Sequence, residues 1–309
     1  MTKPIEKSID KIPVIKHLAR FAKKIPIPGL RGMSLYDIIE LYILGIVRGA
    51  LTSRAGSIAF SFFLALFPFL LFILTLIPYV PIDGFQDDFL GMIETMLPPK
   101  TSDAVDGVIN DIINNKYSGL LSFGFLMSMF LMTNGVNAIF GGFEYTYHKI
   151  KTRSIVRMYM VAFATSLVLA FLLIFSVAVI VEMQIGIAQL EKHNLVNDSL
   201  VWMRFTRTAV VAVSLLIGVS LLFYVGTREG KHLNFFSPGA IFTTVFFAIN
   251  FYVFGIYVTK FATYNKLYGS IGTLLILMLF VWLNSIILLL GFELNTSILR
   301  CKQVKNKHG

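Results

Sequence analysis

The chain has 309 residues, of which 56% are hydrophobic and only 14% are charged, and its mean hydropathy is +0.75. Soluble domains carry about 25% charged residues, so a soluble fold could not bury this many apolar side chains. The single cysteine, Cys301, excludes an intrachain disulfide. The five histidines are scattered without metal-ligand spacing, so we expect no metal and no other cofactor. This composition is typical of a membrane protein.

Residues 1–54 form a basic segment with ten Lys and Arg residues, which we expect on the cytoplasmic face. Apolar residues interleave with lysines over 5–25, which indicates an interfacial helix attracted to anionic lipid. Ser34 is expected to cap a second interfacial helix that ends at Arg48. The segment lacks the layout of a cleavable signal peptide, so the first span should act as its own insertion signal.

Six charge-free stretches are long enough to cross a hydrocarbon core ~30 Å thick as helices. They are 55–82, 117–143, 158–181, 208–227, 233–259 and 267–292. None alternates polar and apolar residues, and backbone groups in lipid must be satisfied within the segment, so helices are expected. The sequence therefore predicts an all-α polytopic membrane protein with a six-helix domain over 55–299 and a basic cytoplasmic tail over 300–309.

The distribution of basic residues sets the predicted orientation. Of the 27 Lys and Arg residues, 20 lie before the first span, after the second, after the fourth and after the sixth. By the positive-inside rule both termini are expected in the cytoplasm. The net charge of +10 then reflects topology and does not by itself imply nucleic acid. The acidic 83–116 connection is predicted to be an extracytoplasmic helical hairpin, broken at Pro98 and Pro99.

Four short motifs carry a resemblance to a known family. They are Ser-x6-Pro in the first span (Ser61, Pro68), Pro-Gly-Ala at 238–240, Tyr-Asn-x-x-Tyr-Gly-Ser at 264–270 and Gly-x-Glu-x-Asn at 291–295. Over roughly residues 35–300 the chain resembles the YihY/BrkB family of bacterial inner-membrane proteins, once labelled ribonuclease BN. Phe60 departs from the tyrosine that is usual there. The resemblance implies six spans, the bacterial inner membrane and an envelope role, for which transport or lipid handling is commonly suspected.

Charged and amide groups at the cytoplasmic mouth form the first candidate site: Arg48, Arg54, Glu293 and Asn295. A charge near the hydrocarbon is costly unless it pairs or faces water. Glu293 ends the sixth span at the depth where Arg54 opens the first, so we predict that Glu293 lies close to Arg54 or Arg48. A structural ion pair and a functional one both remain open. Glu144 with Arg153 or Arg157 is a second candidate pair, for which interfacial anchoring is the simpler interpretation.

Polar groups inside the spans form the second candidate site, because amides in lipid must find partners in the bundle and Pro68 should kink the first span. The candidate polar cavity comprises Ser57, Ser61, Pro68, Asn134, Asn137, Asn250 and Asn284. The alternative is that these side chains line no cavity and only form contacts between helices. The turn with Tyr264, Asn265, Tyr268 and Gly269 is either a tight structural turn or a gate at the outer mouth.

Three functions remain open at this point. A transporter or lipid translocase predicts a polar groove, with basic residues that attract phosphate-bearing headgroups. The alternative is a non-enzymatic assembly or scaffold protein of the envelope. A ribonuclease would need clustered carboxylates or a histidine pair, and the cytoplasmic acids show no such spacing, so we expect neither an enzyme nor a nucleic-acid partner. The expected partners are membrane lipids, chiefly anionic; the substrate and a homo-oligomer are left open.

Overall fold

The computed structural model describes residues 35–79, 115–146, 153–192, 199–232, 234–261 and 270–308. Within these ranges all regular structure is helical, with seven α-helices and two short 3₁₀ turns, η1 (Ile77–Tyr79) and η2 (Gly230–His232). The predicted all-α class is therefore confirmed. The segment before residue 35, the predicted outer hairpin as far as residue 114 and the 264–269 turn lie outside the described residues.

Six of the helices are long and apolar enough to cross a membrane, which confirms the six predicted spans. They are α4 (Leu51–Leu76), α7 (Ser118–Glu144), α8 (Ile155–Lys192), α9 (Ser199–Gly226), α10 (Pro238–Phe261) and α12 (Ser270–His308). The seventh, α3 (Leu35–Arg48), precedes them. Helix α4 begins before Arg54, which therefore lies inside its first turn. Helix α12 runs past residue 300, so the basic tail continues the sixth span as a helix.

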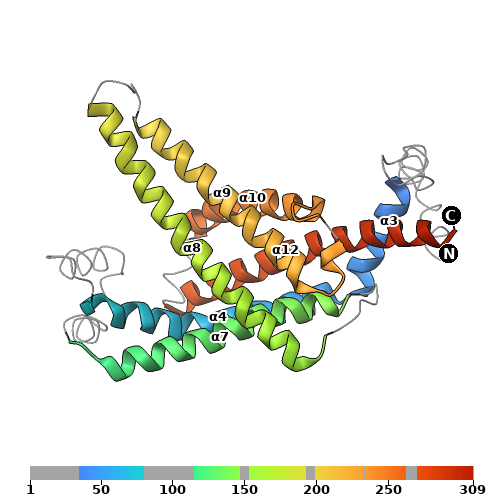
Figure 1. Cartoon of the computed structure of the whole chain (residues 1–309), viewed down its shortest axis with the longest axis horizontal. Coiled ribbons are helices and arrows are strands. Elements are labelled where there is room, and N and C mark those ends of the chain that lie inside the picture. The colour runs from blue at the N-terminus through green and yellow to red at the C-terminus, as the bar shows by residue number, and fades with distance from the viewer. Residues whose placement is uncertain are drawn as a thin grey trace.

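The helices pack as a bundle from which one hairpin leans away. Helix α4 packs along α7 and α12, α10 packs on α12 and α9, and α8 packs on α7 and α9. Figure 1 shows that α8 and α9 run together and diverge from α4 and α7 toward one end. With 38 residues, α8 is about 57 Å long at 1.5 Å per residue. It must therefore tilt or extend beyond a hydrocarbon core ~30 Å thick.

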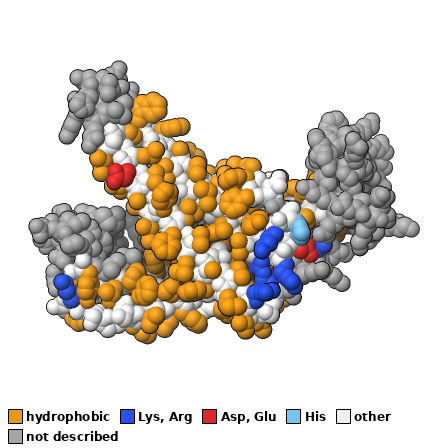
Figure 2. Space-filling model, in the orientation of Figure 1, with side chains coloured by type: hydrophobic (Ala, Val, Ile, Leu, Met, Phe, Trp, Pro, Cys, Tyr) orange, Lys and Arg blue, Asp and Glu red, His pale blue; other side chains and the backbone are white. Residues whose placement is uncertain are grey.

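The buried core lies at the end of the bundle where α4, α8 and α10 begin and where α7 and α9 end. We call this the basic end, because Arg153, Arg157 and Arg228 lie in its connections and first turns. Phe143 stacks on Phe292 there, with ring centroids 4.2 Å apart and planes 11° from parallel. Elsewhere the spans mostly expose apolar side chains (Figure 2), as helices surrounded by lipid do.

Two glycines bring α10 and α12 into backbone contact. A Cβ atom at Gly239 would overlap the carbonyl oxygen of Gly291 and the side chain of Asn295. Asn295 lies one turn beyond Gly291, and its Oδ1 accepts a hydrogen bond from the Gly239 N–H at 2.8 Å while its Nδ2 donates to Ser237 Oγ at 2.8 Å. Small residues permit such close crossings, and Asn295 satisfies an N–H that the start of α10 would otherwise leave unpaired. The Pro-Gly-Ala and Gly-x-Glu-x-Asn motifs are thus the two sides of one helix crossing.

We expect Gly239→Ala to separate α10 from α12 and to lower the free energy of unfolding by about 1–3 kcal/mol or more, the range for overpacking. Gly255→Ala on the same helix is the matched control, because among the described residues no side chain and no atom of another helix lies within 4 Å of a Cβ placed there. Thermal unfolding of both variants in detergent measures the difference. Equal melting temperatures for the two variants would contradict the close crossing.

Candidate functional site

Glu293 forms a buried ion pair with Arg54, the first of the two partners predicted for it. The distance from Arg54 Nη2 to Glu293 Oε1 is 2.7 Å, and the two side chains are 6% and 0% exposed. The hydroxyl of Thr146, just after α7, donates to both carboxylate oxygens at 2.9 and 2.8 Å. The pair therefore joins α12, α4 and the end of α7 at one point. The side chain of Arg48 lies outside the described part of the structure.

The spacing of the α12 motif explains why Glu293 faces α4. Gly291 and Asn295 are about 40° apart around a helix and share one face, whereas Glu293 lies about 200° from Gly291 on the opposite face. Gly291 and Asn295 face α10, so the carboxylate is directed toward α4 and α7. As a result α12 is largely buried here, and Phe292, Glu293, Asn295 and Ser297 are each 0–1% exposed.

Arg54 leaves one of its donors without a partner. Its Nη1 donates to the carbonyl oxygen of Gly142 at 2.8 Å and its Nη2 donates to Glu293. The whole residue is only 7% exposed. Its Nε is buried and makes no hydrogen bond within the described structure. An unsatisfied buried donor costs about 1–3 kcal/mol, and more when it is charged. Arg54 is also one of the residues that line a pocket.

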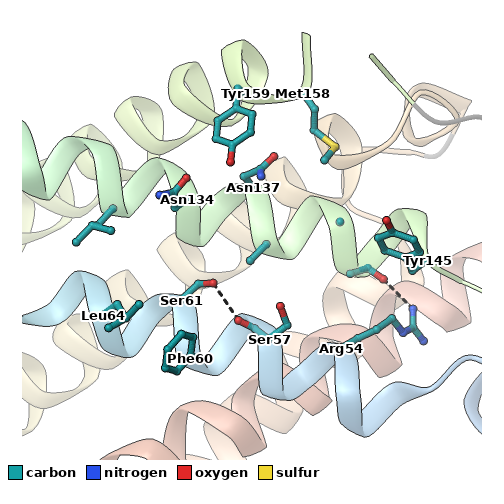
Figure 3. Close-up of a pocket in the computed structure, with 14 residues that line it drawn as sticks. Arg54, Ser57, Phe60, Ser61, Leu64, Asn134, Asn137, Tyr145, Met158 and Tyr159 are labelled. Atoms are coloured by element: carbon teal, nitrogen blue, oxygen red, sulfur yellow. Dashed lines mark hydrogen bonds between the residues drawn. The ribbon is translucent and has the colours of Figure 1, made fainter. Parts of the chain in front are cut away.

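The pocket has a volume of about 470 Å³ and lies between α4, α7 and the start of α8 (Figure 3). We call this pocket the polar groove, after the charged, hydroxyl and amide side chains in its lining: Arg54, Ser57, Ser61, Asn134 and Asn137. Asn137 lies beneath Tyr159 and Met158 of α8 in Figure 3, and its Oδ1 is buried without a partner within the described residues. Two residues of the lining, Arg54 and Asn137, thus each carry a buried polar atom that has no partner within the described residues.

The polar groove opens sideways toward the lipid-facing surface. Ser57 is exposed, and Phe60, Leu64 and Tyr145, which also line the pocket, are 54%, 42% and 80% exposed. Phe60 therefore lies on the rim of the groove. A molecule held by the polar groove would therefore keep contact with the surrounding hydrocarbon.

The structure brings together four of the seven residues predicted for one polar cavity and leaves three apart from it. Pro68 lies on α4 outside the pocket, and Asn250 and Asn284 lie on α10 and α12. Asn284 Nδ2 donates to the carbonyl oxygen of Phe280 in its own helix at 2.8 Å. The predicted outer turn with Tyr264, Asn265, Tyr268 and Gly269 lies outside the described residues, so both interpretations of it stay predictions.

Glu144 and Arg153 meet in a way that the sequence did not indicate. Glu144 Oε1 accepts from the backbone N–H of Arg153 at 3.2 Å, while the Arg153 guanidinium donates to the carbonyl oxygens of Gly226 and Thr227 at 3.3 and 3.0 Å. A cation is favourable at the C-terminus of a helix, here α9. Burial lowers the pKa of Arg153; Glu144 opposes this effect, and the nearby charges of Arg228 and Arg157 add to it.

Two hydroxyl groups near Glu293 were also missed by the sequence analysis, those of Thr146 and Tyr42. Burial, and secondarily the charge of Glu293, raises the pKa of Tyr42 to about 12, so its hydroxyl stays protonated at physiological pH. Helix α3 packs on α12. The available signal was the spacing of four residues from the apolar Ile38, which puts both side chains on one face of a helix; the structure buries Ile38 on that face.

The fold and this arrangement define a six-span helical membrane protein with a buried ion pair and a lateral polar groove. A family model described as "Virulence factor BrkB" matches residues 44–309. The chain belongs to this family, as the sequence motifs predicted.

Three bacterial relatives match most of the chain and most of their own length. It is 32% identical over 264 residues to the putative ribonuclease-like protein YfkH of Bacillus subtilis, covering 83% of this chain and 93% of that protein. It is 23% identical to a UPF0761 membrane protein of Alteromonas mediterranea (85% of this chain, 88% of the relative) and to another from Aggregatibacter aphrophilus (80% and 86%). No solved structure matches.

We expect Glu293→Gln to lower the free energy of unfolding by about 3–5 kcal/mol, because it leaves the buried charge of Arg54 uncompensated. Glu229→Gln is the matched control at the same end. Glu229 pairs with Arg300 at 3.5 Å, with side chains 14% and 23% exposed, so this pair is longer and less completely buried, and its loss should cost less than that of Glu293. Chemical unfolding in detergent tests this. The double variant Arg54→Gln/Glu293→Gln should regain part of the loss, and a Glu293→Gln protein as stable as the control would refute the argument.

Proposed function

We propose that this membrane protein is a transporter of the lipid-translocase type, which receives the anionic headgroup of an amphipathic molecule in the polar groove. The observation that carries the proposal is the buried, unpartnered Nε–H of Arg54 at the basic end of a groove that opens toward lipid. The proposal includes the bacterial inner membrane as the location, and the cytoplasm as the side that the basic end faces, in keeping with the positive-inside rule.

The charges around Arg54 favour an anionic group that does not need to displace Glu293. Glu293 and Gly142 already occupy the two terminal nitrogens, so the pair is neutral and rigid. The remaining Nε–H lies where water is largely excluded, and a charge-assisted hydrogen bond from it to a phosphate or carboxylate oxygen is strong. Asn137 Oδ1 can at the same time accept a hydrogen bond from a hydroxyl or ammonium group of the same headgroup.

The shape of the groove fits an amphipathic molecule better than a small ion. Arg54, Ser57 and Ser61 follow one face of α4 over seven residues, about 10 Å along the helix. Beyond Ser61 the lining becomes apolar at Leu64 and Leu131. A headgroup would thus be admitted from the basic end as far as Ser61 while its acyl chains remain in the lipid. Passage to the other face would require α8 and α7 to separate further along their length.

The scaffold alternative uses the same groove differently, as a seat for a polar side chain of a partner helix, and it predicts no lipid movement. A ribonuclease activity has no positive support in this geometry. Across the described ranges, no group of three or more His, Cys, Asp and Glu residues is placed to hold a metal ion. The printed name of the Bacillus relative describes that protein and supplies no residue that would perform the cleavage.

Asn137→Leu should slow lipid movement about tenfold, because it removes one hydrogen bond worth about 1 kcal/mol and puts an apolar side chain in the groove. Asn284→Leu is the matched control, since that amide bonds within its own helix away from the groove. The assay follows fluorescent phosphatidylglycerol and phosphatidylcholine analogues across proteoliposome membranes with an impermeant quencher.

The control should keep its rate within about twofold, a change of less than half the energy of one net hydrogen bond. The unmodified protein should move the anionic analogue faster than the zwitterionic one. Flux no greater than in protein-free vesicles would overturn the translocase proposal and favour the scaffold. Equal loss in both Asn variants would show that the groove is not the path.

A further inference from the structure

A second groove, of about 410 Å³, lies between α8 and α9 and shares no residue with the polar groove. On α8 its lining includes Arg157, Val161, Ala164 and Val168, which recur at helical spacing along one face; on α9 it includes Leu221 and Val225, one turn apart. The inference drawn from it is independent of the proposed function.

The dimensions and chemistry of this α8–α9 groove fit an acyl chain. From Arg157 to Val168 it follows eleven residues of α8, about 16 Å, which is close to half of a hydrocarbon core ~30 Å thick. Its one hydroxyl, that of Thr165, already donates to the carbonyl oxygen of Val161 at 2.8 Å. Apart from Arg157, the lining therefore presents only apolar surface and no polar group that requires a partner.

The mouth of the α8–α9 groove carries an excess of positive charge, with Arg153, Arg157 and Arg228 near the carboxylate of Glu144. Arg157 and Arg228 are exposed, and both lie close enough to Arg153 to act on its charge. The guanidinium of Arg153 already donates hydrogen bonds to the carbonyl oxygens at the end of α9. Within the described residues no hydrogen bond or ion pair engages Arg157 or Arg228. Figure 2 shows basic side chains gathered where α8 begins and α9 ends, next to an apolar surface.

We propose that the α8–α9 groove binds one anionic phospholipid from the leaflet at the basic end. Its phosphate contacts Arg157 and Arg228, and one of its acyl chains lies along Val161, Ala164 and Val168. Guanidinium groups suit this partner because their planar donors match phosphate oxygens and are weakly hydrated. The bound lipid relieves the repulsion among three arginines and fills the space between the two helices at the base of the hairpin.

The first test measures lipid retention by the full-length protein in mild detergent with native mass spectrometry, using phosphatidylglycerol and phosphatidylcholine with identical chains. We expect preferential retention of phosphatidylglycerol. Arg157→Gln/Arg228→Gln should weaken it about 25-fold, roughly fivefold for each arginine near the membrane surface. The matched control is Arg204→Gln/Arg207→Gln, which removes two exposed arginines of α9 at the opposite end and should leave the affinity unchanged.

The second test separates the acyl-chain groove from its charged mouth. Ala164→Phe fills the groove without changing any charge and should also abolish selective retention, whereas Ala178→Phe, an exposed position further along α8, should not. Inorganic phosphate at millimolar concentration should fail to displace the lipid. The proposal is overturned if phosphatidylcholine is retained equally, if Ala164→Phe has no effect, if the arginine control loses as much, or if free phosphate displaces the lipid.

Discussion

The ion pair between Arg54 and Glu293 is the constraint on which the arrangement of the basic end depends. Two charges removed from water stabilise a fold only when their geometry is close and their remaining hydrogen-bonding groups are satisfied. The carbonyl oxygen of Gly142 and the hydroxyl of Thr146 meet most of that requirement. Since these partners come from α4, α7 and α12, the pair fixes the depth and rotation of three helices, and with them the positions of Ser57, Ser61 and Asn137.

The close crossing of α10 and α12 at Gly239 and Gly291 also positions the ion pair, because it contacts the face of α12 opposite to Glu293. Gly291 and Asn295 hold α10 at backbone distance, and this sets the rotation of α12 about its axis. Glu293 is then directed at Arg54 by the helical repeat alone. A rotation of α12 that released α10 would also withdraw the carboxylate from Arg54. The two interactions are therefore mechanically coupled, although their residues contact different helices.

The sequence predicted the number and type of the helices because the bilayer imposes a length and an apolar composition that can be read along the chain. It also predicted a partner for Glu293, since depth in the membrane can be estimated from position in a span. It could not predict which faces meet. In lipid the outer surface is as apolar as the core, so nothing in the pattern of α10 or α12 separated Asn250 and Asn284 from Asn134 and Asn137. The hydroxyls of Thr146 and Tyr42 were missed for a related reason, because their burial depends on how α3 and the end of α7 close over α12.

Unsatisfied buried atoms do not by themselves define a site in this protein. Within the described residues, Ser220 Oγ, Thr243 Oγ1 and Asn250 Nδ2 are also buried without hydrogen bonds, yet none of them lines the polar groove. Thr243 faces the close approach of Gly291, so its lost hydrogen bond is the consequence of a tight helix crossing. Arg54 Nε and Asn137 Oδ1 differ because both belong to residues that border an open space in which a molecule can supply the missing partner. Under the proposed function, a headgroup that offers an acceptor and a donor would satisfy these two atoms, whereas an apolar chain in the same groove would leave them unpaired.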